Sequence, residues 1–119
     1  LYPVVKIPVK RTDGVNEINF KFEGTGFVLK GEAVSKQGKS DYVFRTELYI
    51  DGTLTETPVL PVGFNTRRNE LCWKYDLTKG KHTVQLKILN PDPAADINSD
   101  EAIIFSDHPV LGLTVNGQR

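Results

Sequence analysis

Apolar and polar side chains alternate along residues 42–50, and this period of two constrains the fold more than any other feature of the chain. The even-numbered positions are aromatic, aliphatic or threonine, whereas the odd-numbered positions include Arg45, Glu47 and Tyr49. Successive side chains of an extended strand point to opposite sides, so the pattern predicts a strand with one buried face and one mostly polar face. Asp51-Gly52 follows directly and is typical of a tight hairpin turn, because both residues tolerate a positive φ.

The same period recurs along the chain and predicts an all-β protein. Further short strands are expected over residues 18–22, 27–33, 53–60, 70–77, 82–89, 102–105 and 110–115. No segment has the period of a long amphipathic helix; the nearest candidate, residues 93–99, is short. Short strands separated by frequent turns are typical of an antiparallel β-sandwich or jelly roll. The residues expected in the core between the two sheets are Phe44, Leu48, Trp73 and Leu86.

Glycine and proline positions predict how the strands are joined. Gly24-Thr25-Gly26 is expected to allow a sharp bend between two strands and not to cradle a phosphate, because it opens a strand instead of a helix. Pro58 lacks a backbone donor and predicts an edge strand or a bulge. The longest loop is expected over residues 90–96, which contain Pro91 and Pro93.

Composition excludes several classes of partner. The 119 residues predict one domain, and 15 basic against 15 acidic residues leave no net charge. Nucleic acids and anionic membranes attract a basic excess, so neither is expected as the main partner, and no apolar run is long enough for membrane insertion. The one cysteine, Cys72, excludes an internal disulfide framework and a zinc site built from cysteines. The sequence has no methionine, even at position 1, so we expect a fragment of a larger multidomain protein.

No set of residues predicts catalysis. His82 and His108 are interpreted as structural, and Cys72 as a buried, inert thiol, although the nearby Lys74 could lower its pKa. Ser106-Asp107-His108 has the residue types of a catalytic triad, but adjacent residues cannot fold onto one another as a triad requires. A small hydrolase is therefore the weakest of the functions considered.

Acidic residues gather late in the chain, where two interpretations stand. Loop oxygens suit a hard cation such as calcium, but the spacing matches no EF-hand loop, and a solvated loop is preferred. No cofactor is predicted, and a structural calcium ion remains the alternative. The acidic residues in question are Asp92, Asp96, Asp100, Glu101 and Asp107.

Two polar regions are candidates for ligand binding. If the strands that carry Arg45, Glu70 and Gln85 are neighbours, their polar side chains form one face that combines charged groups, amides and an aromatic ring, as sugars require. A solvated face held by cross-strand ion pairs is the alternative. The loop over residues 65–69 has two adjacent arginines that could grip a carboxylate or phosphate. The ligand-binding residues expected from the two regions are Arg45, Glu47, Tyr49, Asn65, Arg67, Arg68, Glu70 and Lys74.

Four stretches carry a resemblance to a known kind of module: residues 22–27 (FEGTGF), 47–52 (ELYIDG), 67–75 (RRNELCWKY) and 80–84 (GKHTV). They resemble the β-sandwich attached to bacterial ADP-ribosylglycohydrolase-like proteins and related secreted glycan-active enzymes. They are also similar to the galactose-binding-like jelly rolls beside esterase domains.

The resemblance implies a non-catalytic accessory module of a larger bacterial hydrolase, secreted or periplasmic, with carbohydrate and an upstream catalytic domain as its partners. It supplies no catalytic residue, because the acidic clusters of the helical ADP-ribosylglycohydrolase domain have no counterpart in these strands. A purely structural module, packed through its polar face on a catalytic domain, is the alternative.

Overall fold

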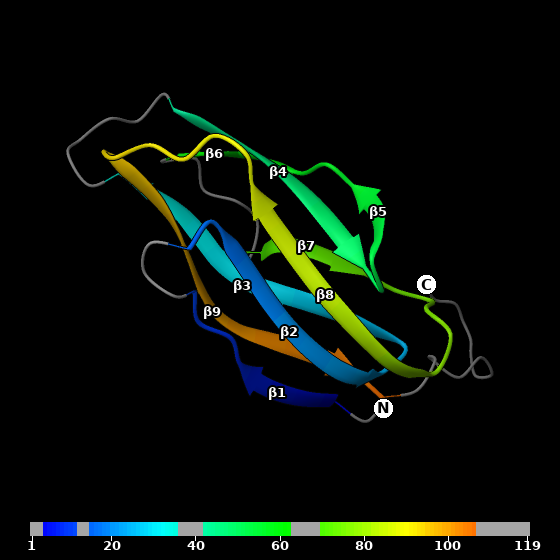
Figure 1. The fold of residues 1–119 in the computed structure, drawn as a ribbon. Helices are drawn as coiled ribbons and strands as arrows, with labels where there is room; N and C mark the ends of the chain where they lie inside the picture. Colours follow the sequence, from blue (N-terminus) through cyan, green and yellow to red (C-terminus); the bar gives the residue numbers. More distant parts are fainter. Residues whose placement is uncertain (1–3, 12–14, 36–41, 63–69, 107–119) are drawn as a thin grey trace.

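The computed structural model describes residues 4–11, 15–35, 42–62 and 70–106, whose strands form two sheets that face each other (Figure 1). The strands are β1 (Val4–Pro8), β2 (Glu17–Gly24), β3 (Gly26–Ser35), β4 (Val43–Ile50), β5 (Thr53–Glu56), β6 (Val59–Pro61), β7 (Glu70–Lys74), β8 (Gly80–Ile88) and β9 (Ala95–Phe105).

All the strand pairs are antiparallel, as the alternation predicts. One sheet has the order β1-β9-β3-β7, and the other has the order β2-β8-β4-β5, with β6 paired to β4 outside that path. In the described part of the chain, no helix is long and apolar enough to cross a membrane. The fold is an antiparallel β-sandwich of the jelly-roll class, and the expected strand at residues 110–115 lies outside the described residues.

The core lies between the inner faces of the two sheets. Phe44, Leu48 and Leu86 are at most 1% exposed, which confirms their predicted place. They come from β4 and β8, and Phe27 and Leu29 of β3 are fully buried in the same cluster. Each such side chain stabilises the fold by about 1.5–3 kcal/mol through removal from water.

The prediction that Trp73 belongs to the core is wrong. Trp73 is 47% exposed, whereas Leu71 and Cys72 just before it are both 3% exposed. The pairing of β7 with β3 shifts between Leu29 and Lys30, so Leu71 is an extra residue in the ladder. Such a bulge breaks the alternation of inward and outward side chains. Strict alternation from the buried Leu71 would make Trp73 point inward, whereas the extra residue makes it point outward.

The Gly24-Thr25-Gly26 bend is confirmed and carries the chain from one sheet to the other. β2 ends at Gly24 and β3 begins at Gly26. Thr25 N donates a hydrogen bond of 2.7 Å to Phe105 O. A Cβ on Gly24 would lie 2.3 Å from the same Phe105 oxygen, so close backbone approach requires a glycine here.

The two other predicted connections near β4 are also confirmed. Asp51 and Gly52 have φ values of 54° and 82°, as a tight hairpin turn between β4 and β5 needs. β5 lies at the edge of its sheet. Pro58 separates β5 from β6, and its carbonyl oxygen accepts a hydrogen bond of 3.1 Å from Thr46 N.

β9 is longer than the sequence predicts. The strand expected over residues 102–105 begins at Ala95. Residues 95–99, most of the range named as the nearest candidate for a helix, and the end of the loop expected over residues 90–96 are therefore extended strand. Pairing with β3 continues from Phe105 to Ala95 with one shift between Lys30 and Gly31. Long-range pairing stabilises an extended conformation that the local sequence does not indicate.

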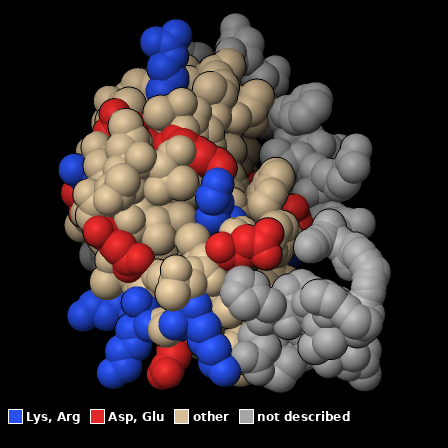
Figure 2. Space-filling model, turned by 90° about the vertical axis from the view of Figure 1, so that its right-hand side faces the viewer, with Lys and Arg blue, Asp and Glu red and all other residues tan. Residues whose placement is uncertain are grey.

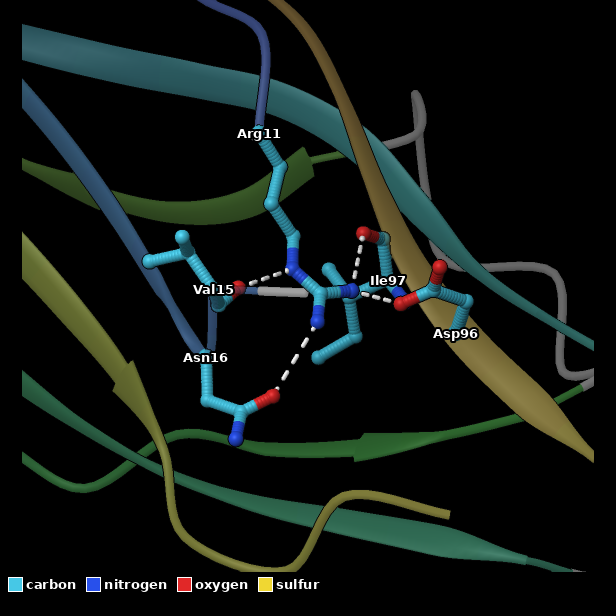
Figure 3. A network of polar contacts seen from close by, with 5 residues as sticks. All are labelled: Arg11, Val15, Asn16, Asp96 and Ile97. Carbon is cyan, nitrogen blue, oxygen red and sulfur yellow. Dashed lines mark hydrogen bonds and ion pairs between the residues drawn. The ribbon is translucent and has the colours of Figure 1, made fainter. Parts of the chain in front are cut away.

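Arg11 joins the segment before β2 to the beginning of β9 (Figure 3). Its Nε donates to Val15 O at 2.7 Å, its Nη2 to Asn16 Oδ1 at 3.2 Å and its Nη1 to Ile97 O at 3.3 Å. The guanidinium also forms an ion pair with Asp96, and the Arg11 side chain is only 12% exposed. One side chain therefore connects segments that lead into both sheets.

Candidate functional site

The outward side chains of β2, β8 and β4 form one continuous polar face. Pairing places Lys87 between Glu17 and Glu47, and Gln85 between Asn19 and Tyr49. The alternate residues of these strands point into the core, so the polar set faces outward. The polar face is defined by Glu17, Asn19, Lys21, Arg45, Glu47, Tyr49, Thr83, Gln85 and Lys87.

Hydrogen bonds hold the side chains of the polar face in place. Tyr49 OH donates to Glu47 Oε1 at 2.9 Å. Gln85 Nε2 and Asn19 Nδ2 both donate to Glu17 Oε1, at 3.1 and 3.3 Å. The hydrogen bond to Glu47 raises the pKa of Tyr49, so its hydroxyl stays protonated and can also accept a hydrogen bond. The face thus presents oriented amide and hydroxyl groups.

A cation covers part of the one aromatic ring on this face. Lys87 Nζ lies 4.9 Å from the centroid of the Tyr49 ring. The attraction of an ammonium group for the ring face competes with any ligand that would stack there. Recognition on the polar face is therefore expected to rely on hydrogen bonds more than on stacking.

A shallow depression of about 390 Å³ opens on the polar face beside the β4–β5 turn. Asn19, Tyr49, Gly52, Thr83 and Gln85 line part of it. Gly52 has no side chain, so the turn leaves the end of the depression open. Amide and hydroxyl groups around a shallow hollow suit a ligand with many hydroxyl groups.

The structure brings together only part of the predicted set. Arg45, Glu47 and Tyr49 lie on β4 of the polar face, beside β8 as expected. Glu70 and Lys74 lie on β7 in the other sheet, so they do not join this face. The predicted residues Asn65, Arg67 and Arg68 lie outside the described residues.

The sequence analysis missed the contribution of β2. Asn19 and Lys21 alternate with Ile18, Phe20 and Phe22, so their outward direction could be read from the sequence. Their place beside Gln85 and Thr83 depends on the pairing of β2 with β8. These two strands are far apart in the chain, and no local signal specifies that they pair.

Cys72 is a poor nucleophile, as the sequence analysis expects. Its side chain is 3% exposed. Burial, with a smaller contribution from the charge of Glu56, raises the pKa of Cys72 to about 12. The thiolate that nucleophilic catalysis needs is therefore scarce at neutral pH.

His82 is held by two acceptors at the end of the sandwich near the β4–β5 turn. Its Nδ1 lies 2.6 Å from Asp51 Oδ2, and its Nε2 lies 2.5 Å from Thr78 O. Both ring nitrogens face acceptors, which favours the doubly protonated imidazolium. The structural interpretation of His82 fits this geometry, and His108 lies outside the described residues.

The late acidic residues do not converge within the described part of the chain. No group of three or more His, Cys, Asp or Glu side chains there is placed to hold a metal ion. Asp96 pairs with Arg11, and Asp92 Oδ2 accepts a hydrogen bond of 3.2 Å from Ala94 N. Asp92 and Asp96 are therefore engaged in contacts within the protein, and Asp107 lies outside the described residues.

Charge is mixed on the face of the molecule drawn in Figure 2. Acidic and basic side chains are interspersed with uncharged surface, and several basic side chains gather at the lower edge. A strong field of one sign, which would attract a polyanion, does not dominate this view.

No protein-family model matches the sequence, and no curated protein matches it. The similarities lie with solved structures. The CBM36-1 domain of a multidomain xylanase from the hindgut metagenome of Trinervitermes trinervoides has a TM-score of 0.51 at 17% identity, and the match covers 85% of this chain and 95% of that domain. A carbohydrate-binding module CBM36 in complex with calcium and xylotriose has a TM-score of 0.50 at 13% identity, covering 86% of this chain and 99% of that one.

The same sandwich also occurs as a part of longer chains. A salicylyl acyltransferase from a tetracycline biosynthetic pathway has a TM-score of 0.51 at 17% identity; the match covers 76% of this chain but only 24% of the acyltransferase. At such low identities these similarities show the fold alone. They support the sandwich part of the resemblance given by the sequence and do not show an association with ADP-ribosylglycohydrolases.

Proposed function

We propose that this chain is a non-catalytic carbohydrate-binding module and that its ligand lies on the polar face. The observation that carries the proposal is the row of Asn19, Gln85 and Tyr49 across three strands, beside the shallow depression. Sugars offer hydroxyl groups that both donate and accept hydrogen bonds, and this row offers amides and a hydroxyl that do the same. Two of the structures with the same fold are carbohydrate-binding modules, one of them in complex with xylotriose, which supports the ligand class.

The module would serve a larger glycan-active hydrolase, secreted or periplasmic. The structural glycans of cell walls lie outside the cell, and a domain that holds such a polymer keeps a catalytic domain close to its substrate by raising the effective concentration. A similar domain belongs to a multidomain xylanase, which supports such an arrangement for this chain.

Titration calorimetry with soluble xylan, cellulose and chitin oligosaccharides tests the proposal. Gln85→Ala and Tyr49→Phe each remove a hydrogen-bonding group and are expected to weaken binding about three- to tenfold. Tyr49→Ala is expected to weaken it further, and Arg45→Ala tests how far the site extends along β4. Glu32→Ala, an exposed substitution on β3, is the matched control.

Unchanged affinity in the Tyr49, Gln85 and Arg45 variants would reject the polar face as the site. Absence of binding to the whole glycan panel would favour the structural alternative. In that case the free energy of unfolding of this domain should rise when the upstream catalytic domain is present, because the polar face would be packed against it.

A further inference from the structure

The outer face of the β1-β9-β3-β7 sheet carries a group of apolar side chains, in contrast to the polar face of the other sheet. Pairing places Ile103, Val28 and Trp73 side by side across β9, β3 and β7. Phe105 and Gly26 form the next row, with Tyr75 directly after the end of β7. We define the aromatic face as Val28, Trp73, Tyr75, Ile103 and Phe105.

The two largest rings of the aromatic face are half exposed. Trp73 is 47% and Tyr75 is 49% exposed, although Val28 beside Trp73 is only 4% exposed. The sequence predicted Trp73 as a core residue, and the bulge at Leu71 turns it outward instead. A single exposed apolar side chain is ordinary, but neighbouring exposed apolar side chains that form one patch are typical of a ligand or partner site.

Packing against the sheet holds the Tyr75 ring in place. The centroids of the Tyr75 and Phe105 rings are 5.5 Å apart. A Cβ added to Gly26 would lie 3.5 Å from Tyr75 Cδ1, so the ring lies directly against the backbone of β3. A ring that is already held loses little conformational freedom when a ligand covers it.

The charges around the aromatic face are balanced. Pairing places Lys30 between Glu70 of β7 and Glu101 of β9, in the row next to Trp73, and it places Lys6 of β1 beside Ile103. Lys74 Nζ lies 3.3 Å from Glu56 Oε2. A ligand of strong charge of either sign therefore gains little here, and a neutral ligand fits best.

We propose that Trp73 and Tyr75 form a second carbohydrate-binding surface, which stacks on the C–H faces of pyranose rings in a neutral glycan chain. Aromatic rings offer large, rigid apolar surfaces, and the Trp73 N–H group can donate a hydrogen bond to a hydroxyl at the edge of a sugar. That the ligand of this second surface is a carbohydrate rests on the proposed function, whereas the position of the surface rests only on the geometry of the aromatic face.

The size of the patch favours a sugar over a second protein. A stable protein interface buries about 800 Å² on each partner. An aromatic side chain supplies about 150–250 Å² when it is fully buried, and these two rings are only half exposed and are bordered by the charged row at Lys30. Val4 of β1, which pairs with Phe105 and is 48% exposed, extends the patch by one small side chain. Two half-exposed rings and a half-exposed valine are enough to cover sugar rings, but their area is below the value of about 800 Å² for a stable protein interface.

Trp73 is the single tryptophan of the sequence, so its fluorescence reports this face specifically. Titration with xylan, cellulose and chitin oligosaccharides is expected to shift the Trp73 emission to shorter wavelength in a saturable way with at least one of them. Tyr75→Ala should weaken that response about tenfold. Trp73→Phe should retain binding to the matching insoluble polysaccharide, and Trp73→Ala should lose most of it. Val15→Ala, which removes another exposed apolar side chain (41% exposed), is the matched control.

The same titrations separate this inference from the proposed function. A Trp73 shift that persists in Tyr49→Ala supports a second surface whether or not the polar face binds. Calorimetric binding that depends on Tyr49 together with unchanged Trp73 emission would overturn the second surface and leave the polar face standing. Unchanged emission with every glycan in a natively folded chain would also overturn it.

Discussion

The two outer faces of the sandwich differ in chemistry, although both belong to antiparallel sheets whose inner faces share one core. On the polar face, β2, β8 and β4 present amides, charges and one tyrosine that are linked by hydrogen bonds across the strands. On the aromatic face, β9, β3 and β7 present rings and aliphatic groups, and Trp73 is 47% exposed. The inner faces of both sheets are apolar because they form the shared core. The two sheets therefore differ mainly in their outer faces, which are the faces that a ligand can reach.

The faces also differ in regularity. The three strands of the polar face pair with one another without a shift, and β4 shifts only against the edge strand β5, between Leu48 and Tyr49. In the other sheet, the register of β3 shifts against β7 after Leu29 and against β9 after Lys30. Bulges change the direction of side chains, and here they bring a tryptophan to the surface.

The largest expected effect concerns the core that both faces share. Leu48→Ala should lower the free energy of unfolding by about 3 kcal/mol, because Leu48 is fully buried and a cavity remains. Leu54→Ala, in the adjacent strand at 47% exposure, is the control and should change it by less than about 0.5 kcal/mol. Urea denaturation measures both. Equal effects from the two variants would contradict the placement of the core between the sheets.

Arg11→Ala should have the next largest effect, a loss of about 2 kcal/mol in the free energy of unfolding. The substitution leaves Asp96 and the carbonyl oxygen of Ile97 without the guanidinium that contacts them. Arg11→Lys should restore only part of the loss, because a single ammonium group cannot reproduce the planar fork. Full stability of Arg11→Ala in urea denaturation would show that the segment before β2 does not depend on this contact.

The directions of side chains on strands with strict alternation could be predicted from the sequence. Phe44, Leu48 and Leu86 were placed in the core, and Arg45, Glu47 and Tyr49 on one outward face, because β4 and β8 are regular strands. The aromatic face could not be predicted, since the extra residue Leu71 has no local signal in the sequence. The neighbours of β8 could not be predicted either, because pairing is decided by the whole fold.

A smaller effect is expected from the pH dependence of the contact between His82 and Asp51, which lies beside the polar face. Burial alone would lower the pKa of His82, but its hydrogen bonds to Asp51 and Thr78 O outweigh burial and raise it. Hydrogen bonds from His82 and Thr83 N lower the pKa of Asp51. Because the pKa of His82 is raised in the fold, His82 contributes its full stabilisation below about pH 6.5, and this contribution is lost as the pH rises through the folded pKa. Because the pKa of Asp51 is lowered, Asp51 contributes its full stabilisation above about pH 3.9, and this contribution is lost as the pH falls through the folded pKa.

Asp51→Asn tests this contact, because asparagine tolerates the φ of 54° at this position. Between about pH 3.9 and 6.5 the variant should be less stable by about 1 kcal/mol or less, since Asp51 is partly exposed. The difference should shrink as the pH rises above the folded pKa of His82. Thermal unfolding across pH 4 to 9 measures it, and a difference that stays constant between about pH 5 and 9 would mean that His82 is not protonated in the fold.

The smallest expected effect concerns the one described ion pair between edge strands of the two sheets, Lys74 of β7 with Glu56 of β5. The two side chains are 37% and 45% exposed, so a double-mutant cycle with Lys74→Ala and Glu56→Ala should give a coupling of about 0.5 kcal/mol or less, reduced further by salt. The Trp73 emission should remain unchanged in Glu56→Ala, because the pairing of β7 with β3 holds Trp73 in place. A coupling well above about 1 kcal/mol would mean that the sheet edges are fastened together, and the two outer faces could then no longer be treated as independent surfaces.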